Sequence, residues 1–93
     1  MTASIYILFS PSLHVFYTGF TTISVVERLK GHNEKYYDNK FTSRVSDWEI
    51  YLTIVCDSEE QARAIESHIK KMKSKIYIAN LKRYPEMIQK LLN

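Results

Sequence analysis

Five residues of this 93-residue chain could together hydrolyse a phosphodiester bond: Tyr6, Tyr17, Arg28, His32 and Glu66. An arginine can bind a phosphate through two parallel hydrogen bonds and offset the charge that develops on it. A histidine, with an ordinary pKa near 6.5, exchanges a proton around neutral pH. A carboxylate is a hard oxygen ligand for Mg²⁺, which keeps several waters and needs few protein ligands. A phenol, with a pKa of about 10, acts as a general base only beside a cation or a metal.

Each of these residues also has an ordinary structural interpretation. Tyrosines in strands usually pack, and Arg28 and His32, four residues apart, would equally suit a solvated helix face. Glu66 could pair with Lys70, again four residues further on. A two-metal site usually gathers several acidic residues, and the sequence shows no such cluster. Any metal chemistry would therefore rest on one ion.

The composition is that of an ordinary small globular protein. The length suits one domain over residues 1–93, with 45% hydrophobic and 25% charged residues. The formal charge of +3 mildly favours a polyanionic partner. The single Cys56 cannot form an intramolecular disulfide, which fits a reducing compartment. Because no targeting segment and no apolar run near the ~20 residues of a membrane span are visible, we expect a cytoplasmic protein without a membrane partner.

Three stretches of β-branched and aromatic residues predict the strands that position the candidate residues. Residues 5–9 and 15–20 flank the turn signal Ser10-Pro11-Ser12, which is typical of a β-hairpin. Alternation along the first strand places Tyr6 and Leu8 on one face, opposite Ile5, Ile7 and Phe9. In a third strand, residues 48–55, the same alternation predicts a face made of three aliphatic residues: Ile50, Leu52 and Ile54.

Serine and proline signals predict where helices begin. Capping boxes at residues 24–27 and 58–61 open two helices, Ser74 caps a further one, and Pro85 suits the first turn of a last short helix. Their apolar sides are predicted to be Val25, Val26 and Leu29, then Ala62, Ile65, Ile69 and Met72. Residues 34–47 are expected to form an ordered surface loop. The order β-β-α-β-α-α describes an α+β fold with a small, three-stranded, mostly antiparallel sheet flanked by helices.

The same residues resemble the two name motifs of the GIY-YIG nuclease superfamily, particularly its small single-domain bacterial members related to excision-repair endonucleases. The first motif is present as Ser4-Ile5-Tyr6 and the second as Tyr17-Thr18-Gly19, with their tyrosines eleven residues apart. Ser4 replaces the first glycine of the family pattern, and Thr18 replaces its isoleucine. The family varies at both positions, and neither supplies the chemistry.

Two helices extend this resemblance over about residues 4–92. Residues 26–33 look like the family's arginine helix, which ends in His-Asn, and residues 64–70 are similar to its metal-binding glutamate helix. Asn80, fourteen residues past Glu66, resembles the asparagine that often follows that glutamate. The fold implied is GIY-YIG endonuclease-like.

The resemblance also implies roles for the five residues. One divalent metal, Mg²⁺ or Mn²⁺, would be held by Glu66. Tyr6 and Tyr17 would orient or deprotonate the attacking water with help from His32, while Arg28 would stabilise the transition state.

Three further residues would support the site. Gly19 would allow a close approach of the backbone because it has no Cβ. Asn33 follows the histidine of the arginine helix, and Asn80 would contribute a hydrogen bond.

Lysines and aromatic residues outside the motifs suggest how a nucleic acid would be bound. Lys70, Lys71, Lys73 and Lys75 would contact DNA phosphates. Aromatic residues of the loop could stack on unpaired bases: Tyr36, Tyr37 and Phe41. Equally, the lysines could be a solubilising face and the aromatic residues a lid over the core.

We therefore expect a Mg²⁺-dependent DNA endonuclease or nicking enzyme that acts by one-metal, water-mediated attack. Branched and flapped DNA are among its candidate substrates, and a monomer or weak homodimer is expected. Two alternatives remain open from the sequence: a catalytically inactive nucleic-acid-binding module of the same fold, and a protein-interaction domain.

Overall fold

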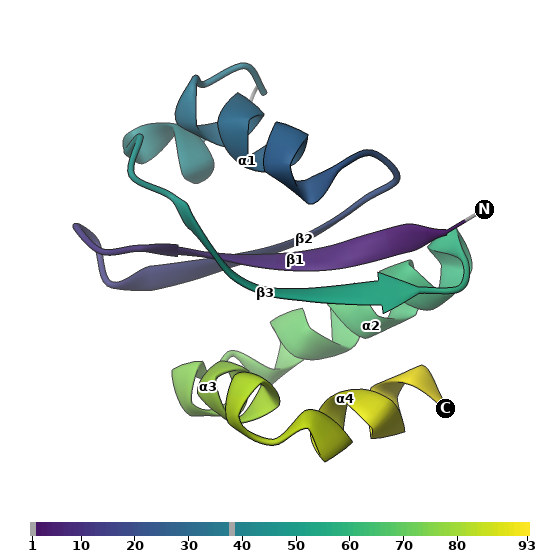
Figure 1. The fold of residues 1–93 in the computed structure, drawn as a ribbon. Coiled ribbons are helices and arrows are strands. Elements are labelled where there is room, and N and C mark those ends of the chain that lie inside the picture. Colours follow the sequence, from purple (N-terminus) through teal and green to yellow (C-terminus); the bar gives the residue numbers. More distant parts are fainter. Residues whose placement is uncertain (1, 38) are drawn as a thin grey trace.

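The structure, a computed structural model, describes residues 2–37 and 39–93. Its centre is an antiparallel sheet of three strands in the order β2-β1-β3: β1 (Ala3–Ser10), β2 (Val15–Thr21) and β3 (Glu49–Cys56). Helix α1 (Val25–Asn33) and the short 3-10 helix η1 (Thr42–Arg44) lie on one face of the sheet (Figure 1). The other face is covered by α2 (Glu59–Met72), α3 (Lys75–Arg83) and α4 (Pro85–Leu92).

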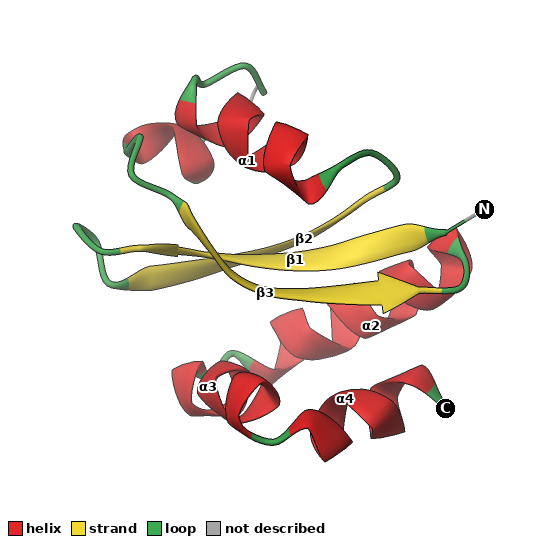
Figure 2. Cartoon of the chain, in the orientation of Figure 1, coloured by secondary structure: helices red, strands yellow, loops and turns green. Residues whose placement is uncertain are grey.

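The fold class predicted from the sequence is confirmed. The elements follow the order β-β-α-β-α-α, and α4 adds one helix after α3. The strands form the middle of three layers, with helical segments above and below them (Figure 2). As expected, Pro85 opens α4, and α1 ends at Asn33 with Glu34 as its cap.

The central strand β1 is buried on both faces, because helices pack against each side of the sheet. Ile5 and Ile7 are fully buried in a cluster that includes Ile65 of α2. Tyr6 and Leu8, also fully buried, belong to a second cluster on the α1 side. The alternation predicted for this strand is therefore confirmed, and it directs Tyr6 toward α1.

The alternation predicted for β3 is wrong in the middle of the strand. The register against β1 shifts between Ile7 and Leu8, which pair with Leu52 and Ile50 respectively. Tyr51 is the extra residue, and it packs against the same cluster as Leu52. A bulge of this kind reverses the face of the residues beyond it, so Ile50 leaves the predicted aliphatic face.

Two of the three predicted serine caps form. The hydroxyl oxygen of Ser58 accepts a hydrogen bond from the amide of Gln61, and that of Ser74 accepts one from the amide of Tyr77. The reciprocal half of the capping box differs from the expected pattern, because the Gln61 side chain accepts from the amide of Asp57. Three residues of the stripe predicted on α2 are buried, whereas Met72 is exposed: Ala62, Ile65 and Ile69.

The capping box predicted at the start of α1 does not form. Ser24 is the N-cap residue, but its side chain makes no capping hydrogen bond. The predicted apolar arc of this helix is also narrower than expected, because Val26 is exposed, whereas Val25 and Leu29 pack against the cluster around Tyr6. The loop that follows is ordered around η1; Asp38, which belongs to that predicted loop, lies outside the described residues.

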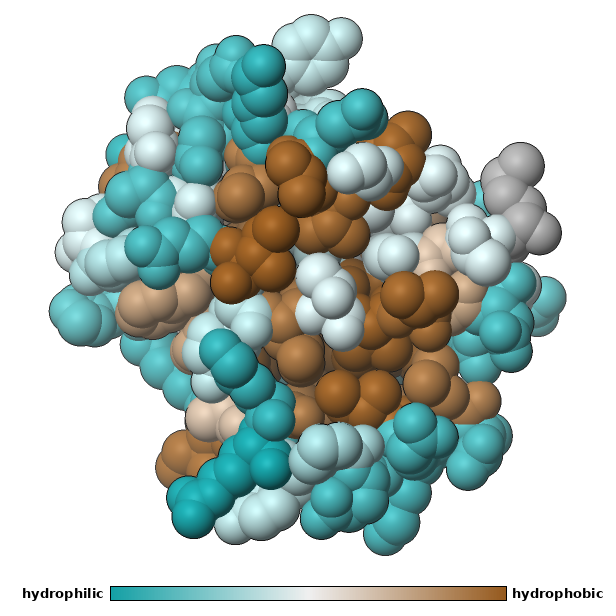
Figure 3. All heavy atoms as spheres, in the orientation of Figure 1, coloured by the Kyte–Doolittle hydropathy of each residue, from teal (hydrophilic) through white to brown (hydrophobic). Residues whose placement is uncertain are grey.

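The face of the molecule crossed by β3 carries a central apolar area surrounded by hydrophilic side chains (Figure 3). Ile50 and Val55 of β3 are among the exposed large apolar residues. Cys56, at the end of the strand, is buried as expected for a packing residue. Within the described ranges, no helix has both the length and the apolar character that crossing a membrane requires.

Candidate active site

The first two candidate residues lie on adjacent strands and point to the same side of the sheet. Tyr6 of β1 pairs with Gly19 of β2, and Tyr17 pairs with Leu8. The two tyrosine rings are 6.3 Å apart between centroids. A Cβ atom on Gly19 would lie 2.5 Å from the Tyr6 hydroxyl oxygen. The absence of a side chain at Gly19 therefore lets the Tyr6 phenol lie across the edge strand.

Helix α1 brings two further candidates to the Tyr6 hydroxyl. The Nη2 atom of Arg28 donates to this oxygen at 3.3 Å, and Nε2 of His32 is 3.0 Å from it. His32 is only 1% exposed. Because residues four apart share one face of a helix, both side chains reach the sheet together. The solvated-face interpretation of Arg28 and His32 is therefore wrong.

The other ring nitrogen of His32 is held by a residue that the sequence did not reveal. Nδ1 of His32 lies 3.0 Å from the hydroxyl oxygen of Thr42 in η1. Thr42 is itself fixed, because its carbonyl oxygen accepts a hydrogen bond from the indole of Trp48 at 2.8 Å. Both Thr42 and Trp48 are buried. A neutral imidazole donates from one nitrogen and accepts at the other, so the Thr42 contact determines which nitrogen faces Tyr6.

Asn39 has a similar role beside Tyr17. Its Nδ2 donates to the Tyr17 hydroxyl at 3.0 Å, while its Oδ1 accepts from the amides of Phe41 and Thr42. This side chain therefore links the turn before η1 to the second tyrosine. Asn39 and Thr42 come from a polar loop, and no spacing in the sequence pointed to them.

Tyr37 covers Arg28 on the side away from Tyr6. The Arg28 guanidinium carbon is 4.0 Å from the centroid of the Tyr37 ring, a cation–π contact. Gly31 makes room for this ring, because a Cβ there would clash with Tyr37. Among the described residues, the buried Nε of Arg28 has no hydrogen-bond partner. A guanidinium held in this way keeps a donor available for an anion.

Burial and charge set the protonation of this cluster. Burial raises the pKa of Tyr6, whereas its hydrogen bond to Arg28 and the charge of Arg28 oppose the rise. Burial also lowers the pKa of His32 to about 4, and the positive charge of Arg28 lowers it further. His32 is therefore neutral at pH 7, instead of titrating there as the sequence suggested, and it can accept a proton.

Glu66 approaches from α2, on the opposite face of the sheet from α1. Its side chain is 19% exposed and forms an ion pair with Lys70 at 3.4 Å, so the predicted pair is present. The Glu66 charge also acts to raise the pKa of Tyr6. Lys70 lies 5.9 Å from the centroid of the Tyr17 ring. Glu66 is therefore near the two tyrosines, although it belongs to another layer.

Residues 2–82 match the family model described as the GIY-YIG catalytic domain. The chain belongs to the GIY-YIG family. This family consists generally of endonucleases, and GIY-YIG nucleases act on DNA. Comparisons with curated proteins and with solved structures found no match. The predicted resemblance is thus confirmed over most of the chain.

The supporting residues expected of a GIY-YIG site occupy different environments. Asn33 joins the end of α1 to β3, because its side chain donates to the Trp48 carbonyl at 3.0 Å and accepts from the Trp48 amide at 2.8 Å. Asn80 lies in α3, and in the described structure no hydrogen bond joins its side chain to Tyr6 or Glu66. Asn33 therefore holds the GIY-YIG arginine helix in place, and the role of Asn80 stays a prediction.

The loop aromatics separate into the two roles that the sequence left open. Tyr37 covers Arg28, and Phe41 stacks on Tyr17 at a centroid distance of 5.8 Å. These two rings cover the GIY-YIG site as a lid. Tyr36, by contrast, is 81% exposed. The four lysines predicted to bind DNA are all exposed: Lys70, Lys71, Lys73 and Lys75.

The donor set near Glu66 suits only an ion that needs few protein ligands. The described part of the chain contains no group of three or more His, Cys, Asp or Glu side chains that could hold a metal. A single carboxylate is compatible with Mg²⁺, which takes oxygen ligands and retains several waters. The residues present therefore fit a weakly held, largely hydrated divalent ion.

Proposed function

We propose that this chain is a metal-dependent DNA endonuclease that cuts one strand at a time. The observation that carries the proposal is the convergence of Arg28 and His32 on the Tyr6 hydroxyl at the edge of β2. A cation, a neutral proton acceptor and a phenol within hydrogen-bonding distance form a set that can bind a phosphate and activate water. One such set in a monomer corresponds to one cut per binding event.

Arg28 is the proposed ligand of the scissile phosphate. Its guanidinium is held between Tyr6 and Tyr37, and its Nε is buried without a partner among the described residues. An anion bound there would satisfy this donor. Because the guanidinium is already oriented, it stabilises the charge that develops in the transition state without reorganising.

Tyr6 and His32 are the proposed proton acceptors. In the tautomer whose Nδ1–H donates to Thr42, the free Nε2 accepts the Tyr6 hydroxyl proton. A water proton can then pass to the Tyr6 oxygen while the Tyr6 proton passes to His32. The lowered pKa of His32 keeps the ring neutral and ready to accept before the reaction. Tyr17, held by Asn39, would orient the water.

Glu66 is the proposed ligand of Mg²⁺ or Mn²⁺. Such an ion, when bound, would polarise a phosphate oxygen and lower the pKa of a bound water. Glu66 would exchange its ion pair with Lys70 for the metal. Lys70 would then be available to a DNA phosphate.

A cleavage assay with matched glutamate variants tests the proposal. Supercoiled, flapped and branched DNA are incubated with Mg²⁺, Mn²⁺ or EDTA. Wild type should produce nicked circles only with a metal, and Glu66→Gln should reduce the rate by at least ~100-fold. Glu60→Gln, an exposed position on the same helix, is the control and should cut like wild type.

The alternatives give different results in the same assay. Salt-sensitive DNA binding without cleavage under any metal condition would identify a nucleic-acid-binding module that has lost turnover. An absence of both binding and cleavage would favour a protein-interaction domain. Equal cleavage by Glu66→Gln and wild type would refute the assigned metal ligand.

A further inference from the structure

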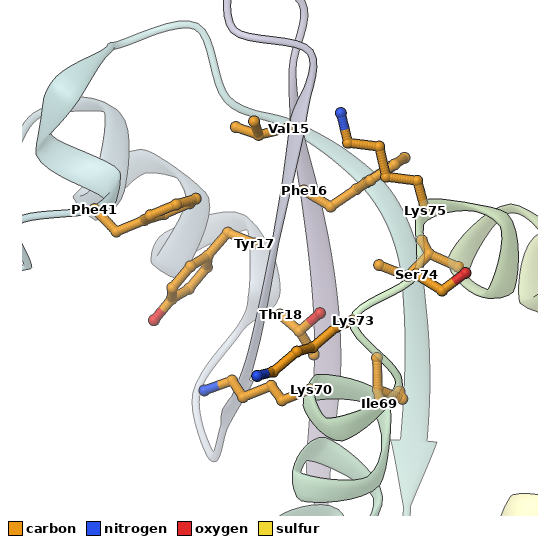
Figure 4. Close-up of a pocket in the computed structure, with 11 residues that line it drawn as sticks. Val15, Phe16, Tyr17, Thr18, Phe41, Ile69, Lys70, Lys73, Ser74 and Lys75 are labelled. Carbon is orange, nitrogen blue, oxygen red and sulfur yellow. The ribbon is translucent and has the colours of Figure 1, made fainter.

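A pocket of about 450 Å³ opens beside the edge strand β2, next to Tyr17. It lies between this strand on one side and the end of α2 with the start of α3 on the other (Figure 4). Its volume is within the ~300–1,000 Å³ range of small-molecule sites. Because β2 is an outer strand of the sheet, the pocket can be reached from solvent.

Aromatic rings line much of this pocket. Tyr17 and Phe41 are stacked at 27° between their ring planes, and Phe41 remains 39% exposed. Phe16 lines the pocket nearer to Lys75, and Ile69 of α2 contributes to the opposite side (Figure 4). Exposed aromatic side chains are platforms for nucleobases, since every base has a π-face.

The remaining wall is basic. Lys70, Lys73 and Lys75 line the pocket, and the side chains of Lys70 and Lys73 extend toward Tyr17 (Figure 4). Lys75 donates to the carbonyl oxygen of His14 at 2.5 Å, which holds it at the turn between β1 and β2. Of these lysines only Lys70 is in an ion pair with a described residue. The positive charges therefore exceed the negative ones at this pocket.

Lys71 is the exception among the four predicted DNA-binding lysines. It is exposed on α2 but does not line the pocket. The geometry thus selects three lysines that the sequence grouped with a fourth.

An aromatic wall beside cations matches an unpaired nucleotide better than a duplex. A duplex hides its base faces by stacking and presents mainly phosphates, for which the lysines alone would suffice. An unpaired nucleotide presents both a base face and a phosphate. Tyr17 belongs both to this pocket and to the cluster around Tyr6, so a strand bound at Arg28 has its neighbouring nucleotide within reach of the pocket.

We propose that the pocket binds an unpaired nucleotide next to the scissile phosphate, with the base against Phe41 and Tyr17 and a phosphate at Lys70 and Lys73. The inference rests on the proposed endonuclease function, and it narrows the substrate class to DNA with a single-stranded segment. The flap or single strand, and not the duplex, then supplies the specific contact.

Binding in EDTA separates recognition from cleavage. Labelled single-stranded, flapped and duplex oligonucleotides of one sequence are titrated by fluorescence anisotropy at several salt concentrations. Wild type should bind the first two about tenfold more tightly than the duplex, and Phe41→Leu should remove this preference. Abasic substitution of one flap nucleotide after another should weaken wild-type binding at the nucleotide that enters the pocket.

Charge variants test the basic wall. Lys73 has a left-handed backbone conformation, with φ at 46°, so Lys73→Asn removes the charge with a residue that tolerates it. The double variant Lys73→Asn/Lys75→Gln should reduce the salt slope for single strands by about 1.4, or ~0.7 for each lost phosphate contact. Lys30→Gln/Lys90→Gln removes the same charge from α1 and α4 and should bind like wild type.

Equal affinity for duplex and single strand, unchanged in Phe41→Leu, would overturn the proposed base site. Equal salt slopes for the two double variants would overturn the phosphate contacts. If wild type binds unpaired DNA as predicted but never cuts any substrate, the proposed endonuclease fails and the pocket remains. If it cuts duplex and flap equally with all pocket variants unimpaired, this inference alone fails.

Discussion

The Tyr6 phenol and Gly19 occupy one place in the sheet, because the ring of Tyr6 lies where a side chain on Gly19 would project. A Cβ on Gly19 would be 2.5 Å from the Tyr6 hydroxyl oxygen and 2.6 Å from Cζ of the same ring. Both strands are fixed by their pairing, and the ring is fully buried. The position of the hydroxyl that Arg28 and His32 share therefore depends on one missing methyl group.

Gly19→Ala should reduce cleavage far more than it destabilises the fold. Overpacking of this kind costs about 1–3 kcal/mol, whereas a displacement near 1 Å of a catalytic group can lower the rate ~100-fold. Urea unfolding and the rate of plasmid nicking measure the two effects separately. Nicking at the wild-type rate would show that the Tyr6 hydroxyl is not needed at its present position.

His32 should make the protein less stable in mild acid. Its folded pKa is about 4, below the ordinary 6.5, so the unfolded chain binds a proton before the folded chain does. The stability from the neutral ring is complete above about pH 6.5 and is lost as the pH falls toward about 4. The loss should reach up to about 3 kcal/mol.

Urea unfolding of wild type and His32→Gln at several pH values measures this contribution. The difference in free energy of unfolding between them should shrink as the pH decreases through that window. His68→Gln, which removes an exposed histidine of α2, should follow wild type. Parallel curves for wild type and His32→Gln would contradict the lowered pKa.

Thr42→Val should weaken the site without changing its shape. It removes the oxygen that contacts Nδ1 of His32 and leaves a buried ring nitrogen without a partner. The expected loss of stability is about 1–3 kcal/mol. Cleavage should fall as well, because the ring is no longer held in the tautomer that faces Tyr6. Thr42→Ser, which keeps the hydroxyl, should restore both; failure of this rescue would assign Thr42 to packing alone.

The two serines that begin α1 and α2 should respond differently to alanine. Ser58→Ala removes the acceptor of the Gln61 amide and should cost about 1 kcal/mol. Ser24→Ala removes no capping hydrogen bond and should change stability by only a few tenths of a kcal/mol. Thermal unfolding of the two variants provides the comparison. Equal losses would mean that Ser24 caps its helix in solution.

Local patterns were sufficient for most of the fold. Alternation in β1 assigned Tyr6 and Ile5 to opposite faces, and serine signals located the starts of α2 and α3, because these depend on residues only a few positions apart. Alternation failed in β3, where the bulge at Tyr51 depends on pairing with β1. A bulge is a property of two strands, so one strand's sequence does not reveal it.

The candidate site divides in the same way. Motif spacing alone identified Tyr6, Tyr17, Arg28, His32 and Glu66 as residues with the right chemistry. Tertiary structure added Thr42 and Asn39, which reach their partners from a loop without a motif.

Tertiary structure also decided the charge state of His32, because burial and the nearby Arg28 exist only in the folded chain. It separated Lys71 from the lysines of the pocket, since that choice depends on how the end of α2 faces β2. The sequence thus determined which chemical groups are present and in which elements they lie. Contacts between residues far apart in the chain decided their orientation, their protonation and their access to a substrate.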